Sequence, residues 1–161
     1  MVISDTSPLN YLILIGCDDV LPQLYHQVVV PVAVLQELQH SDTPSAIAQW
    51  IASPPPWLRV EEVGGVSDPA LNELGAGERE AILLAQRIPE ALLLIDEIRG
   101  RAEAQRRGIA LTGTLGILDA GAEAGLLNLP EALNRLRTTS FYVAPILFKR
   151  LLEKDAVRRN T

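Results

Sequence analysis

The chain has 161 residues, of which 48% are apolar and 4% aromatic, and its formal net charge is −6. This length and composition predict one domain with a core of aliphatic side chains, and they exclude a disordered chain. No apolar run reaches the roughly 18 residues that span a bilayer, and the N-terminus lacks the pattern of a secretory signal. Cys17 is the only cysteine, which excludes an internal disulfide and a cysteine-based zinc site, so we expect a cytoplasmic protein.

The charge is divided unevenly along the chain. Residues 1–78 carry ten acids and one base, for a net charge of −9, whereas residues 79–161 carry ten acids and thirteen bases, for +3. Basic clusters on helices are usually solvated faces, but a positive rim beside an acidic site would suit a polyanion. Because the chain is acidic overall, we exclude a protein that coats nucleic acid.

Predicted strands and helices alternate along the chain. Short apolar runs predict strands at Met1–Ser4, Val28–Val30, Ala91–Ile95 and Ile109–Leu111, with an extended or edge segment at Leu58–Val63. Apolar periodicity, with Pro near helix starts and Gly near helix ends, predicts helices at Pro8–Ile15, Val32–Gln39, Ser45–Ala52, Glu78–Arg87, Ile98–Arg107, Leu115–Ala124, Pro130–Leu136 and Ala144–Glu153. Gly64–Gly77 is predicted to be a loop with one short helical piece. This alternation indicates an α/β fold, with a parallel sheet between two layers of helices.

Two acidic residues directly follow predicted strands. Asp5 comes after Met1–Ser4, and Asp96 comes after Ala91–Ile95. An open parallel sheet binds its ligands just beyond the carboxyl ends of its strands, so these two carboxylates are expected to meet and to hold a divalent metal. A helix N-cap is the alternative role for Asp96.

Three glutamates add to this acidic set. Glu37 lies among apolar residues with no base nearby in sequence, although the exposed face of an amphipathic helix is an alternative for it. Glu80 precedes an apolar run, and Glu78 is explained equally well by the dipole of the helix that it begins. Carboxylates that are crowded together need a counter-ion or a proton. Their hard oxygens suit Mg²⁺ or Mn²⁺, which can activate water and shield a phosphodiester.

Five short motifs, in this order, resemble those of PIN-domain ribonucleases. They are Asp5-Thr6-Ser7-Pro8-Leu9, Pro31 to Leu38 with Glu37, Gly77 to Ala85 with Glu78 and Glu80, Leu94-Ile95-Asp96-Glu97, and Gly113-Thr114-Leu115-Gly116. The likeness is to small prokaryotic members with a GTLG motif, which are similar to VapC-type toxins. It implies a three-layer α/β/α sandwich with a central parallel sheet, as a single domain over residues 1–161. The motifs occupy about residues 1–120, and a helical part without a family motif follows at about 121–161.

The resemblance also implies roles for individual residues. The catalytic and metal-binding quartet would be Asp5, Glu37, Glu80 and Asp96, holding Mg²⁺ or Mn²⁺ for the hydrolysis of RNA. Glu80 is preferred to Glu78 because Ala81 and Ala85 then fall where the family's third helix has small residues. The accessory residues would be Ser7, Thr114, Glu78 and Glu97, and the candidate RNA contacts are Arg99 and Arg101. The expected partners are RNA, a small antitoxin protein and a second copy of the chain in a homodimer, with no membrane.

Two other functions stay open. A PIN-like fold without its metal would be a catalytically silent interaction module. A phosphatase of the haloacid-dehalogenase type also has Asp after its first strand, but its second Asp would fall on Ser7. The spacing of His26 and His40 fits no zinc motif. No interleaving of basic and aromatic residues is present, so core or interface positions are predicted for Tyr11, Tyr25, Trp50 and Trp57.

Overall fold

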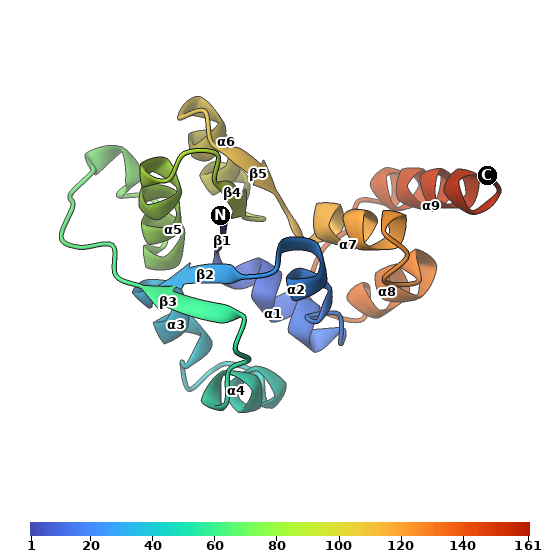
Figure 1. The fold of residues 1–161 in the computed structure, drawn as a ribbon, viewed down its shortest axis with the longest axis horizontal. Coiled ribbons are helices and arrows are strands. Elements are labelled where there is room, and N and C mark those ends of the chain that lie inside the picture. Colours follow the sequence, from blue (N-terminus) through green and yellow to red (C-terminus); the bar gives the residue numbers. More distant parts are fainter.

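A five-stranded parallel sheet forms the centre of the protein in the computed structural model, which describes residues 1–161 (Figure 1). Its strands are β1 (Val2–Ser4), β2 (Val28–Pro31), β3 (Leu58–Glu61), β4 (Leu92–Leu94) and β5 (Ala110–Thr112). Their order across the sheet is β3-β2-β1-β4-β5, and every neighbouring pair is parallel. The predicted strands are therefore confirmed, and β3 is an edge strand as expected.

Nine helices flank the sheet. They are α1 (Thr6–Leu14), α2 (Val20–Tyr25), α3 (Val32–Leu38), α4 (Ser45–Ala52), α5 (Ala76–Arg87), α6 (Ile98–Arg106), α7 (Thr114–Glu123), α8 (Leu129–Leu136) and α9 (Pro145–Arg159), with one 3₁₀ turn, η1 (Pro69–Leu71). The sequence did not predict α2, and it ended α9 six residues too early, at Glu153. The last turn of α9 is supported by ion pairs from Arg158 and Arg159 to the buried Asp155.

Alternate residues of each inner strand face opposite helical layers. In β2, Val28 and Val30 join the core formed with α1–α4, α7 and α8, whereas Val29 joins the core formed with α5 and α6. Strands that are buried on both faces read as continuous apolar runs, which is why Val28-Val29-Val30 shows no polar alternation. The two cores make a three-layer α/β/α sandwich, which confirms the predicted fold class.

The sheet changes winding direction at β1. The chain passes from β1 to β2 and β3 on one side, then crosses to β4 and β5 on the other. The segments that leave the carboxyl ends of β1 and β4 therefore diverge and open a crevice between them. The backbone N–H of Asp5 donates to the carbonyl of Leu94 at 2.9 Å, which fixes Asp5 beside the end of β4. Asp5 and Asp96 are thereby brought to one crevice.

The C-terminal helices pack onto the same body. Leu129, Leu133 and Leu136 of α8 are buried in the core that contains α1. In α9, Lys154 and Arg158 pair with Asp119 of α7 at 2.6 and 2.8 Å. Figure 1 shows α7, α8 and α9 together on the right of the molecule, with the C-terminus. None of the helices is both long and apolar enough to cross a lipid bilayer.

Candidate active site

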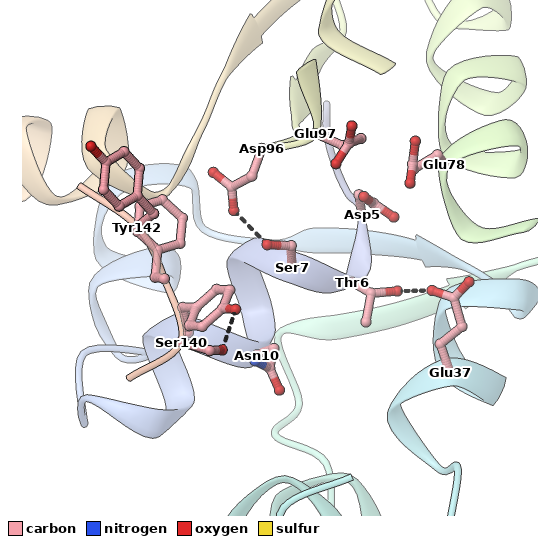
Figure 2. Close-up of a pocket in the computed structure, with 12 residues that line it drawn as sticks. Asp5, Thr6, Ser7, Asn10, Glu37, Glu78, Asp96, Glu97, Ser140 and Tyr142 are labelled. Carbon is pink, nitrogen blue, oxygen red and sulfur yellow. Dashed lines mark hydrogen bonds between the residues drawn. The ribbon is translucent and has the colours of Figure 1, made fainter. Parts of the chain in front are cut away.

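A cavity of about 390 Å³ lies at the carboxyl ends of β1 and β4 (Figure 2). Twelve residues line it, and five of them are acids: Asp5, Glu37, Glu78, Asp96 and Glu97. The other seven are Thr6, Ser7, Asn10, Tyr11, Ser140, Phe141 and Tyr142. The lining contains no Lys, Arg or His, and none of the five acids takes part in an ion pair. The cavity therefore gathers negative charge without a protein cation to balance it.

Asp5 is the most deeply buried of these acids, with only 4% of its surface exposed. Burial raises the pKa of its carboxyl to about 7, and repulsion from Glu78, Glu37 and Asp96 adds to the effect, although the backbone N–H of Thr6 opposes it. At neutral pH a large part of the Asp5 population holds a proton unless a cation is present. Asp5 is thus a group whose charge depends on what occupies the cavity.

Asp96 is fixed by three hydrogen bonds. Its Oδ2 accepts from the hydroxyls of Ser7 at 2.8 Å and Thr114 at 2.7 Å, and its Oδ1 accepts from the backbone N–H of Thr114 at 2.7 Å. A Cβ on Gly113 would lie 2.7 Å from Oδ1, so only glycine allows this approach. Asp96 does not cap α6, because Glu97 occupies that position. It faces the first turn of α7, whose dipole favours the charged carboxylate.

Glu37 points into the cavity and does not lie on a solvated helix face. It accepts hydrogen bonds from the Thr6 hydroxyl and from the backbone N–H of Gly77, the latter at 3.0 Å. A Cβ at position 77 would lie 2.5 Å from Glu37 Oε2, so the absence of a side chain at Gly77 lets the Glu37 carboxylate reach this backbone N–H. The structure therefore places Glu37 in the same cavity as Asp5 and Asp96.

Glu78 has an unsatisfied carboxylate oxygen. Its Oε2 is buried without a hydrogen-bond partner, against Gly100, where a Cβ would lie 3.2 Å from that oxygen. Burial raises the pKa of Glu78, and Glu97 and Glu37 raise it further. A buried carboxylate oxygen without a donor is costly unless a proton or a cation compensates it. Glu78 therefore has the environment that we had predicted for Glu80.

Glu80 lies outside the cavity, so the predicted preference for it over Glu78 is wrong in its geometry. Residues two apart on a helix point about 200° apart, and only one of them can face the other acids. Glu80 Oε1 instead accepts from the backbone N–H of Ala33 at 3.0 Å, in the first turn of α3. The small residues Ala81 and Ala85 pack into the core and do not mark the side of α5 that faces the acids.

The two arginines predicted to contact RNA lie near the strand ends without lining the cavity. Arg101 Nη1 donates to the carbonyl of Ile95 at 2.8 Å, and it does not form an ion pair with Asp96. Arg99 is 72% exposed in its side chain, and its Nη1 lies 3.8 Å from Glu73. Arg101 thus supports the end of β4, whereas the Arg99 guanidinium is available to solvent.

Sequence reasoning missed part of the lining. Thr6 lines the cavity. Its position next to Asp5 in the first motif could have predicted this. Tyr11, expected in a core or an interface, lines the cavity, and its hydroxyl shares a 2.8 Å hydrogen bond with Ser140. Ser140, Phe141 and Tyr142 come from the part of the chain without a family motif, so no sequence signal pointed to them.

The donor set fits a divalent cation, although it is not preassembled. No three of the carboxylates lie close enough together to form a ready set of metal ligands. The cavity nevertheless offers several hard oxygens, no competing cation, an orphaned oxygen on Glu78 and a carboxyl on Asp5 that resists ionisation. Asp5, Glu78 and Glu97 make few or no side-chain hydrogen bonds, so their carboxylate oxygens are the ones available to coordinate a cation.

In this α/β sandwich, carboxylates gather at the place where the sheet changes winding direction. Such a protein belongs to the class that binds ligands at the carboxyl edge of a parallel sheet. The chain belongs to the PIN-domain family, since a family model described as a PIN domain matches residues 1–156. PIN domains are generally nucleases and typically use divalent metal ions. Neither the curated proteins nor the solved structures contain a match to the chain. Because the chain belongs to this family, we no longer consider it a phosphatase of the haloacid-dehalogenase type.

Proposed function

We propose that this protein is a metal-dependent endoribonuclease that hydrolyses phosphodiester bonds in RNA. The observation that carries the proposal is the cavity with five acids and no balancing cation, in a chain of the PIN-domain family. The two acids whose pKa values are raised, Asp5 and Glu78, mark where positive charge would be most stabilising.

Each acid has a distinct place in this proposal. Asp5 and Glu78 would hold Mg²⁺ or Mn²⁺ together with Asp96, and Glu37 and Glu97 would complete the set. The bound ion would lower the pKa of water and neutralise charge on the phosphate. Ser7 and Thr114 orient Asp96 through their hydrogen bonds. Thr6 orients Glu37 in the same way.

Purified protein is expected to cleave single-stranded RNA in millimolar Mg²⁺ or Mn²⁺, and Asp5→Asn is expected to abolish this cleavage. The reason is that Asn keeps the size of Asp5 but cannot supply a negative charge. Gel analysis of end-labelled RNA, with and without a chelator, measures the effect. Asp42→Asn is the matched control, because the Asp42 side chain is 90% exposed and does not line the cavity.

Two results would contradict the proposal. Cleavage that survives Asp5→Asn in highly purified protein would place the activity elsewhere. A melting temperature that Mg²⁺ and Mn²⁺ leave unchanged, in wild-type protein that does not cleave RNA, would favour the silent interaction module.

We also propose that the whole chain is one PIN domain and that it acts in the cytoplasm. In this proposal it is the toxin of a toxin–antitoxin pair, and it forms a homodimer. The support for a protein partner is a set of exposed apolar side chains on α9: Ile146, Leu147 and Val157. Light scattering after size exclusion measures the oligomeric state. Co-expression with the product of a small neighbouring reading frame tests for an antitoxin, which should copurify with the chain and suppress its cleavage of RNA.

Arg99→Ala is expected to weaken RNA binding and to flatten its salt dependence by about 0.7 in slope, the value for one phosphate contact on a single strand. Arg101→Ala is expected to lower the melting temperature instead, because its guanidinium is bonded to the carbonyl of Ile95. Binding of labelled RNA across a salt series, in the Asp5→Asn background, separates the two effects. An unchanged slope for Arg99→Ala would place the RNA surface elsewhere.

A further inference from the structure

One wall of the acidic cavity comes from the segment between α8 and α9. Ser140, Phe141 and Tyr142 line the cavity with residues of α1. Tyr11 holds this segment in place, since its hydroxyl bonds Ser140 Oγ at 2.8 Å and its ring meets Phe141 edge-on, with the centroids 5.0 Å apart. The wall is therefore fixed at Ser140 and Phe141, directly before Tyr142.

Tyr142 itself is exposed and has no partner within the protein. It is 78% exposed, its hydroxyl makes no hydrogen bond, and its ring makes neither an aromatic pair nor a cation–π contact. Figure 2 shows its ring on the side of the cavity next to Asp96, with Glu37 on the opposite side. The Tyr142 ring is large and lies at the rim of the acidic cavity, directly after a fixed stretch of backbone. It therefore presents a flat apolar face to a ligand that enters the cavity.

Nucleic acid bases are the ligands that match this arrangement. A single strand presents its phosphates to charged groups and its bases to aromatic rings, and stacking tolerates any base because each has a π-face. In a duplex, these faces are already stacked on their neighbours. A phosphate held at the acids would leave a neighbouring base on the side where Tyr142 stands.

We propose that Tyr142 stacks on the base of a nucleotide next to the phosphodiester held at the acidic cavity. This inference rests on the proposed ribonuclease function and adds a residue that binds the base beside that phosphodiester. Tyr142 binds and positions the strand, and it takes no part in the chemical step.

The first test separates binding from chemistry. Loss of one stacked base costs about 1–3 kcal/mol, so Tyr142→Ala is expected to raise KM for single-stranded RNA by about 5- to 150-fold while kcat changes little. Tyr142→Phe and Tyr142→Trp keep the ring face and should keep KM near the wild-type value. Val66→Ala is the control, because Val66 is 52% exposed and does not line the cavity. An unchanged KM for Tyr142→Ala, or equal cleavage of a duplex of the same sequence, would overturn the stacking proposal and leave the ribonuclease in place.

The second test does not depend on cleavage. In buffer with Mg²⁺ and in the Asp5→Asn background, which is not expected to cleave, a single-stranded oligoribonucleotide of about ten nucleotides should quench the fluorescence of Tyr142→Trp more than that of the protein with Tyr142, whose tryptophans are Trp50 and Trp57. An abasic strand of equal length should remove this difference. Quenching without any metal-dependent cleavage would support stacking while the ribonuclease fails. Equal quenching by the intact and abasic strands would overturn stacking, and would favour a protein partner for the exposed ring.

Discussion

Glu78→Gln is expected to lower RNA cleavage at saturating Mg²⁺ by at least about 100-fold, the upper range for residues that only support a metal ligand. Glu78 lines the cavity and its buried Oε2 has no hydrogen-bond partner, so no protein group neutralises its charge. Glu80→Gln should keep most of the activity, because Glu80 bonds the backbone of Ala33 outside the cavity. Initial rates of both variants over a metal titration measure the difference.

Stability provides the complementary measurement. Glu80→Gln should lower the free energy of unfolding by about 1 kcal/mol, since a charged acceptor at the start of α3 is weakened. Glu78→Gln should not destabilise the metal-free protein, because it removes a buried charge that nothing balances. If Glu80→Gln were inactive and Glu78→Gln active, Glu80 would be the catalytic acid in spite of its position.

Asp5→Asn is expected to make the metal-free protein more stable at pH 8 but not at pH 4. The pKa of Asp5 is about 7 in the folded state and 3.8 without perturbation. Between these values the folded protein keeps a proton that the unfolded chain has lost, so the stability of the wild type falls as pH rises. A difference of about three pKa units corresponds to at most about 4 kcal/mol. Asn does not ionise and escapes this loss.

Urea denaturation in the presence of a chelator, at a series of pH values, measures the effect. The gain in unfolding free energy of Asp5→Asn over the wild type should grow between about pH 4 and pH 7 and then level off. Asp42→Asn, on the exposed loop before α4, should show no such trend. A gain that is the same at every pH would mean that Asp5 ionises as an ordinary carboxyl.

Local sequence patterns were sufficient for most of the sheet. The run Val28-Val29-Val30 is apolar at every position because both faces of β2 are covered. Such a run can be recognised in the sequence before the fold is known. The short helix α2 was missed because Pro22 falls inside six residues that carry no clear periodicity. Its stability comes from burying Val20 and Leu21 against the body, which is a tertiary effect.

The candidate site was only partly visible in the sequence. The meeting of Asp5 and Asp96 follows from strand ends that lie side by side, so it needed only the parallel sheet. The choice between Glu78 and Glu80 needed the direction in which α5 meets α3, and that packing joins residues far apart in the sequence, such as Gly77 and Glu37. Tyr142 reaches the site through the packing of α8 and α9, which no local motif encodes.

The cavity combines the two ends of the chain, because Asp5 follows the first strand and Tyr142 precedes the last helix. During synthesis, β1 waits for β4 before the centre of the sheet can form, and the wall at Ser140–Tyr142 is translated later still. A chain that is still attached to the ribosome therefore has an open, incomplete cavity.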